Sequence, residues 1–242
     1  MDELQKQQII ESAKEYFRSK IIVNHRKNVE KLSLASFDIN PFSINYLAVF
    51  LCGNTEPESM AKALVYPRVL GTSFNTTFGA QLQKFIATLK QVAGKGSVSP
   101  GFDLEFTDAI DGKTKYCQCK AGPNTINKDD VPTILKHFKD FRTLAKTNGL
   151  SINRCDVVLG VLYGERPLTT FYSAVEEAEY SVYYGEEFWE HLTGDKDFYY
   201  RLAKAFGEVA DEPAFNGCSL INQKIRQIAD EIRIKINKNG SL

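Results

Sequence analysis

The sequence predicts an α/β fold in which a mixed β-sheet is flanked by helices and additional helices lie at both ends of the chain. Three patterns support this class: helical periodicity before residue 92, a strand–turn–strand pattern over 102–120, and an apolar strand at 157–162 that follows a helix. The 242 residues suffice for one compact domain. Within it we expect an N-terminal helical region at 1–65, an α/β core at 66–180 and a C-terminal helical region at 181–242.

The helices before residue 92 follow from the spacing of apolar residues, which recur every three or four positions. Asn40-Pro41 marks a boundary, because a residue before proline avoids the helical conformation. The run 94–101 is rich in Gly and Ser and cannot extend a helix. The predicted helices span 2–20, 41–51, 56–65 and 76–92.

Two strands joined by a tight turn come next. Residues 102–107 alternate between apolar and polar side chains, as a half-buried strand does. Asp111-Gly112 is a strong signal for a hairpin turn. Residues 115–120 then form the returning strand, so the first two strands are antiparallel.

A helix and a third strand complete the core. Asp129 and Asp130 suit a helix N-terminus, and residues 148–149, Asn-Gly, end that helix. Residues 157–162 are almost wholly apolar, as in a strand covered on both faces. Because a helix joins the second and third strands, we expect them to be parallel. From residue 186 onward the tail is mostly helical.

Composition and charge narrow the functional classes only slightly. Hydrophobic residues make up 43% and charged residues 25%, and 30 basic residues balance 30 acidic ones. A nonspecific nucleic-acid binder would have a basic excess, whereas a sequence-specific enzyme can confine its positive charge to one cleft. The charged N-terminal helix is no signal peptide, and no apolar run is long enough to span a membrane. We therefore expect a cytoplasmic protein without membrane contact.

The five cysteines do not predict a disulfide framework, because their number is odd and their spacing wide. Cys117 and Cys119 share a strand face, but a closed zinc site would need further Cys or His ligands nearby. We expect reduced, partly buried thiols.

Four polar side chains on the hairpin strands are the candidate catalytic residues. Asp103 and Glu105 are two residues apart and share a face of the first strand, and Gln118 and Lys120 share a face of the second. The hairpin would bring two carboxylates, an amide oxygen and an ammonium into one patch. The alternative is a solvated face with weak surface ion pairs.

This combination of groups suits phosphodiester hydrolysis. Hard oxygen ligands hold Mg²⁺, which polarises a phosphoryl oxygen and lowers the pKa of a bound water. A lysine beside the metal can orient that water or stabilise the charge that develops on the phosphate.

The segments GFDLEF at 101–106 and YCQCKAGPNTINKDD at 116–130 carry the most specific pattern in the chain. They resemble the core of the PD-(D/E)xK type II restriction endonucleases, in particular a subgroup with glutamine in place of the second acid. The helix–strand–strand–helix–strand order also matches that superfamily's core. The resemblance extends from about Tyr66 to Asp211 and implies that 66–180 is the nuclease core.

The resemblance implies a role for each matched residue. Asp103 would be the metal-binding acid, and Gln118 takes the place of the usual Asp or Glu. Cys119 would offer its backbone carbonyl to the metal, and Lys120 would be the catalytic lysine. Gln83 stands where some relatives carry a glutamate that joins the site.

Both glutamines remove negative charge from the expected site, so a weaker metal site is the expected consequence. Glu105 is the acid that could compensate for the loss, as a further metal ligand or catalytic group. The alternative is that Glu105 is a solvated or supporting acid.

Polar residues on either side of the core are candidates for DNA contact. Asn124, Asn127 and Lys128 follow the second strand directly and could donate to the phosphate backbone. Turn formation explains Asn residues there equally well. Arg68 and Asn75 precede the core helix and could also enter the DNA cleft.

The function that the resemblance implies is that of a Mg²⁺-dependent type II restriction endonuclease, which cuts double-stranded DNA at a palindromic site and leaves 5′-phosphates. Such an enzyme would be a prokaryotic, cytoplasmic homodimer with a separately encoded DNA methyltransferase as its partner. The resemblance favours a short GC-rich palindrome of the GGNCC kind. The alternatives are a structure-specific nuclease of the same fold and a DNA-binding protein with a degenerate centre.

Overall fold

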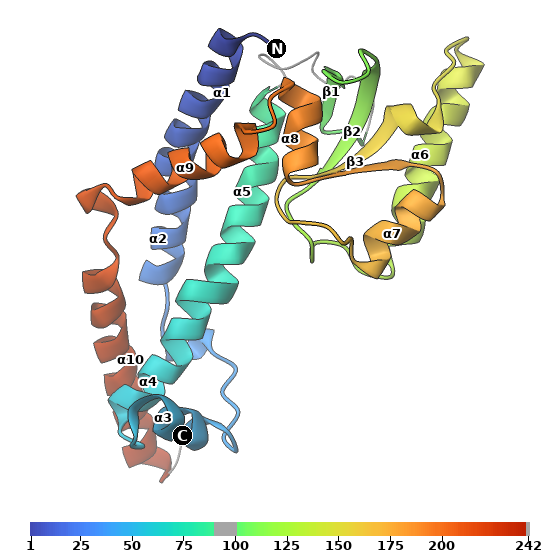
Figure 1. The fold of residues 1–242 in the computed structure, drawn as a ribbon. Helices are drawn as coiled ribbons and strands as arrows, with labels where there is room; N and C mark the ends of the chain where they lie inside the picture. The colour runs from blue at the N-terminus through green and yellow to red at the C-terminus, as the bar shows by residue number, and fades with distance from the viewer. Residues whose placement is uncertain (90–100, 241–242) are drawn as a thin grey trace. The chain divides into compact units, whose positions relative to one another are not determined.

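The structure, a computed structural model, describes residues 1–89 and 101–240, without the side chains of residues 83 and 87 (Figure 1). It consists of helices and one mixed β-sheet, which confirms the predicted α/β class. The chain divides into two compact units, one of Met1–Phe17 with Gly79–Val209 and one of Arg18–Phe78 with Ala210–Leu242. The regions 1–65, 66–180 and 181–242 describe runs of sequence, and as domains they stay a prediction.

The sheet of the first unit has four strands in the order β1-β2-β3-β4. β1 and β2 are antiparallel, whereas β2, β3 and β4 are parallel to one another, so the predicted hairpin and the predicted parallel pair are both confirmed. The fourth strand was not predicted, because it is only four residues long and follows a short helix. The strands are β1 (Leu104–Thr107), β2 (Thr114–Lys120), β3 (Val157–Val161) and β4 (Ser181–Tyr184).

Helices cover the sheet and complete this unit. α6 connects β2 to β3 and α7 connects β3 to β4, as parallel strands require. Trp189 of α8 donates through its indole N–H to the carbonyl of Leu162 at 2.9 Å, which anchors that helix at the end of β3. The helices are α1 (Glu3–Tyr16), α6 (Asp130–Thr147), α7 (Thr170–Glu177), α8 (Glu186–Thr193) and α9 (Phe198–Ala210).

One hydrophobic core of this unit lies between one face of the sheet and the helices α6 and α7. Val157, Leu159 and Val161 point to this face from β3 and are fully buried, as their apolar run predicted. They pack in one cluster with Phe138 of α6 and Tyr172 of α7. Each such side chain contributes about 1.5–3 kcal/mol of burial free energy, so this cluster holds β2 and β3 in place.

The second unit is helical and has its own core. Val65 of α4 packs with Ile228 and Ile232 of α10 and with Ala48 of α3. None of the helices in the described part of the chain is long and apolar enough to cross a membrane. The helices are α2 (Val23–Glu30), α3 (Ile44–Cys52), α4 (Pro57–Pro67), α5 (Phe74–Thr88, shared with the first unit) and α10 (Cys218–Asn239).

Two of the predicted helices continue further than expected. Helical structure runs on past Lys20 through a π-helical turn, Phe17–Ile22, into α2. It also runs past Pro67 through a second such turn, Arg68–Ser73, into α5. The break expected after Val65 was wrong: α4 includes Pro67, which has no N–H to donate, and the π-helical turn Arg68–Ser73 follows it directly. The end of the predicted helix 76–92 and most of the Gly-rich run lie outside the described residues.

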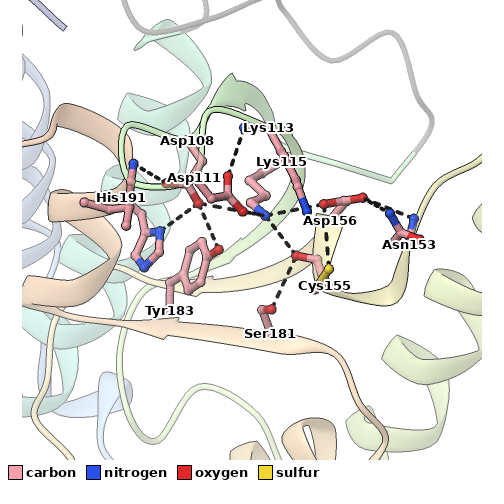
Figure 2. Close-up of polar contacts among 11 residues, drawn as sticks. Asp108, Asp111, Lys113, Lys115, Asn153, Cys155, Asp156, Ser181, Tyr183 and His191 are labelled. Carbon is pink, nitrogen blue, oxygen red and sulfur yellow. Dashed lines mark hydrogen bonds and ion pairs between the residues drawn. The ribbon is translucent and has the colours of Figure 1, made fainter.

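A network of charged side chains, most of them buried, joins the hairpin to β3 (Figure 2). Lys115 on β2 is 1% exposed. Its ammonium donates to Asp111 at 2.7 Å, to the carbonyl of Cys155 at 3.2 Å and to Asp156 at 3.4 Å. Burial disfavours the charged form of Lys115, but the hydrogen bond to Asp111 and the surrounding carboxylates outweigh it and raise the pKa of the ammonium.

Asp108 extends the network to α8. Its carboxylate lies 3.9 Å from the ammonium of Lys115 and accepts a hydrogen bond from the hydroxyl of Tyr183 at 3.0 Å. His191 Nδ1 lies 2.7 Å from the same oxygen, and the His191 ring stacks on Tyr183. Burial and the charge of Asp108 raise the pKa of Tyr183, so the phenol stays a neutral donor. The network thus fixes the turn of the hairpin against β3, β4 and α8.

Replacing Lys115 with Met should lower the free energy of unfolding by about 3–5 kcal/mol, because buried carboxylates lose their cation. Urea denaturation followed by circular dichroism measures this change. Lys113→Met, at the exposed neighbour in the same hairpin, is the matched control and should stay within about 0.5 kcal/mol of the wild type. Equal effects of the two substitutions would contradict a structural role for the network.

Candidate active site

The segment that leads into β1 is fixed by close packing against α6. Gly101 has a φ of 85°, and a Cβ there would lie 2.2 Å from Nε2 of His137. The ring of Phe102, which is buried, lies 4.6 Å from the ring of Phe141. Glycine is required where the backbone is left-handed and a ring approaches so closely. The Gly-Phe pair therefore determines where Asp103 stands.

The carboxylate of Asp103 is bonded to β2. Its Oδ2 accepts a hydrogen bond from the N–H of Cys119 at 2.7 Å, and its own N–H donates to the carbonyl of Cys117 at 2.9 Å. In a longer β1 strand a main-chain carbonyl would accept the Cys119 N–H, so the carboxylate replaces that acceptor. The N–H and C=O of one strand residue point to the same edge, so the Cys119 carbonyl points to the Asp103 side of β2.

Gln118 and Lys120 flank Cys119 on β2 and are both half-buried. The Oε1 atom of Gln118 is buried and has no hydrogen-bond partner among the described residues. Lys120 has no ion-pair partner in the described part of the chain. Within the described residues, an amide oxygen without a partner and an ammonium without a counter-ion thus lie on either side of Cys119, where Asp103 is bound.

Glu105 lies two residues after Asp103 and is 7% exposed. It stands directly across from Tyr116 in the β1–β2 ladder. Burial, with the charge of Glu105 as a second cause, raises the pKa of Tyr116. Paired residues of antiparallel strands share a face, so Glu105 faces the same side of the sheet as Tyr116. Strand alternation places Gln118 and Lys120 on that face as well.

The donor set at this site consists of oxygen atoms. It includes one carboxylate oxygen of Asp103, the Gln118 amide oxygen and the Cys119 carbonyl, with Glu105 nearby on the strand. Among the described residues no group of three or more His, Cys, Asp or Glu side chains is arranged to hold a metal. Oxygen donors of this kind fit Mg²⁺ or Ca²⁺ and do not form the soft-ligand site that zinc prefers. The buried Oε1 without a partner is the observation that favours an ion there.

The polar residues of the loop after β2 have different roles: one shapes the turn and the others face solvent. Asn127 Oδ1 accepts the N–H groups of Asp129 and Asp130, at 2.8 and 3.2 Å, so this side chain shapes the turn before α6. Asn124 and Lys128 are exposed, and their side chains have no such bonds among the described residues. Turn formation thus accounts for Asn127, whereas Asn124 and Lys128 face solvent.

Tyr172, which the sequence did not indicate, also shapes this loop. Its hydroxyl donates to the carbonyl of Gly122 at 2.9 Å and lies 3.0 Å from Oγ1 of Thr125. Burial raises the pKa of Tyr172 to about 12, which keeps the hydroxyl protonated. No sequence signal pointed to Tyr172, because helix α7 itself was not predicted.

The remaining candidates lie elsewhere. Arg68 and Asn75 are exposed and belong to the second compact unit. Gln83 lies on α5, but its side chain is outside the described part of the structure. The structure therefore groups Asp103, Gln118 and Lys120 around Cys119, with Glu105 next along β1.

Replacing Asp103 with Ala should cost about 1–3 kcal/mol of stability, because the buried N–H of Cys119 loses its acceptor. Asp103→Asn is the matched control, since its amide oxygen can still accept that hydrogen bond. Urea denaturation without divalent metal compares the two variants. If Asp103→Ala were as stable as Asp103→Asn, the Cys119 hydrogen bond would not be part of the folded protein.

Comparison with known proteins places these residues in a family context. The family described as "Type II restriction endonuclease EcoO109I" matches residues 10–214, a stretch that contains the whole sheet and the Asp103 site. None of the curated proteins compared with the chain matches it. The match covers most of the chain and confirms the resemblance to type II restriction endonucleases and the fold expected from it. The chain therefore belongs to the type II restriction endonuclease EcoO109I family, a family of site-specific deoxyribonucleases.

Proposed function

We propose that the residues around Asp103 form the catalytic centre of a Mg²⁺-dependent endonuclease that hydrolyses double-stranded DNA at a specific site and leaves 5′-phosphate ends. The observation that carries this proposal is the bond from Asp103 to Cys119, between Gln118 and Lys120. This bond brings together an acid, an amide oxygen and an ammonium, and among the described residues the latter two have no partner. A solvated strand face would leave the amide oxygen in water, whereas Oε1 is buried.

The residues that would hold Mg²⁺ are Asp103, Gln118 and Cys119. Asp103 has Oδ1 left after Oδ2 accepts the Cys119 N–H, and Gln118 and Cys119 supply an amide and a main-chain oxygen. When bound, Mg²⁺ polarises the scissile phosphate and makes a bound water more acidic. Glu105 supplies a second negative charge on the same strand, and we propose that it supports the metal site.

Lys120 acts on the substrate itself in this proposal. Its ammonium has no counter-ion among the described residues, so it is free to bind a phosphoryl oxygen or the attacking water. A cation at that position stabilises the charge that develops on the phosphate in the transition state. Because Gln118 is neutral, the positive charge of Lys120 is less compensated than it would be beside an acid.

DNA contacts next to the catalytic strand are proposed for Asn124 and Lys128, which are exposed directly after β2. Asn127 contributes by shaping the loop rather than by contact. Arg68 and Asn75 would contact DNA from the helical unit. Their exposure supports this role, since phosphate contacts need side chains that reach solvent.

We further propose a homodimer, because a two-fold symmetric protein matches a palindromic site such as one of the GGNCC kind. Helix α3 and the turn before it support this, since they expose a row of large apolar side chains. A patch of that kind on a folded domain is typical of a protein interface. Its most exposed members are Phe42, Tyr46 and Phe50. A separately encoded DNA methyltransferase would protect the host's own sites.

A digest of phage DNA tests the catalytic assignment. With Mg²⁺ the wild type should give discrete fragments, and Lys120→Ala should cut about 100- to 1,000-fold more slowly, because it removes a group that stabilises the transition state. Lys136→Ala, at an exposed lysine of α6, is the control and should cut like the wild type.

The pattern of products decides between the candidate functions. A smear in place of bands would favour a structure-specific nuclease, and intact DNA with both Mg²⁺ and Mn²⁺ would favour a DNA-binding protein with a degenerate centre. Undiminished cutting by Lys120→Ala would refute the assignment of the site.

A further inference from the structure

A polar pocket of about 360 Å³ lies in the helical unit, between the end of α2 and the π-helical turn that follows α4. Two cationic side chains line it, Lys31 and Arg68. The hydroxyl groups of Thr72, Ser73 and Thr76 line it as well, and no carboxylate does. The pocket therefore offers many hydrogen-bond donors and a net positive charge.

Neither cation is neutralised within the described part of the chain. Lys31 and Arg68 are both exposed, and no ion pair or hydrogen bond of either side chain occurs among the described residues. Some other cations of this unit are paired: Arg18 with Glu212 and Lys62 with Glu58. In a chain of zero net charge, two cations in one pocket, neither paired among the described residues, form a local positive site.

The walls of the pocket are held together without a ligand. His25 of α2 lies with Nε2 3.1 Å from the carbonyl of Val69 in the π-helical turn, and its ring packs edge-on against Phe74. Asn28 donates to the buried hydroxyl of Thr77 at 3.1 Å. Two bonds thus join α2 to the turn and to the start of α5, so the donors keep their positions before anything binds.

We propose that this pocket binds a phosphate group of the DNA backbone and thereby gives the helical unit a DNA contact of its own. Guanidinium, ammonium and hydroxyl donors without an acidic partner form the set that phosphate oxygens accept from. π-Helical turns occur frequently at functional sites, and here the turn carries Arg68, Thr72 and Ser73. This proposal rests on the proposed DNA-cleaving function. It identifies a backbone phosphate as the group that Arg68 and Lys31 contact together.

The salt dependence of DNA binding tests the proposal. The full-length protein and the double variant Lys31→Gln/Arg68→Gln are titrated with a fluorescent DNA duplex in EDTA at several salt concentrations. The slope of log K against log salt should become shallower by about 1–2 in the variant, because each lost phosphate contact releases about one counterion fewer. The matched control Arg226→Gln/Lys238→Gln removes the same charges from α10 and should keep the wild-type slope.

A second arm identifies the source of the phosphate. Duplexes with one neutral methylphosphonate at each position in turn should include a position that weakens the wild type and leaves the double variant unchanged. An unchanged slope in the double variant would overturn the proposal. A second combination of results would also overturn it. Inorganic phosphate would raise the melting temperature of the wild type but not of the variant, and no methylphosphonate position would distinguish the two proteins. The pocket would then bind free phosphate and not DNA. DNA binding is measured in EDTA, where no cleavage occurs. The binding result therefore does not depend on whether Lys120→Ala abolishes cutting, so the phosphate pocket and the catalytic site are tested independently.

Discussion

The hydrogen bond between the carboxylate of Asp103 and the N–H of Cys119 ties the end of β1 to the strand that carries Gln118 and Lys120. The antiparallel pairing of β1 with β2 keeps this bond in place, and a slip of one residue would turn every side chain to the opposite face. The buried ammonium of Lys115 holds the other end of the hairpin among carboxylates. The site thus lies at one end of the β1–β2 pairing, and the buried charges around Lys115 stabilise the other end.

The unusual feature of the site is its neutral amide. Gln118 contributes an oxygen without a charge, and in the proposed metal site the carboxylate of Asp103 must carry most of the attraction for a divalent ion. A buried amide oxygen without a partner costs free energy, about 1–3 kcal/mol, until something satisfies it. An ion or a bound water would recover that cost, so the folded protein favours an occupied site. Glu105, buried next along the strand, adds negative charge close to the same position.

The sequence predicted the elements whose signals lie in their own residues, and it missed those that depend on contacts elsewhere in the fold. The hairpin and the apolar β3 follow from alternation, a turn dipeptide and an apolar run, and both were found. β1, however, begins only at Leu104 with three buried residues in a row, and residues 108–113 form a longer connection than the tight turn expected. The two continuous helices were cut short, because π-helical turns have no sequence signature that distinguishes them from a break at Pro67. Strand β4 was missed because its pairing with β3 is set by tertiary contacts and not by its own four residues. The site residues were named from spacing, but the Asp103–Cys119 bond and the unpartnered Gln118 oxygen needed coordinates.

The most direct measurement of the central claim is a crystal structure of the protein with a DNA duplex and Ca²⁺. One Ca²⁺ should lie within about 2.3–2.6 Å of a carboxylate oxygen of Asp103, of Gln118 Oε1 and of the Cys119 carbonyl. The ammonium of Lys120 should lie within hydrogen-bond distance of the phosphate at the metal. A metal bound elsewhere on the DNA-facing surface, with the Gln118 oxygen still without a partner, would contradict the account.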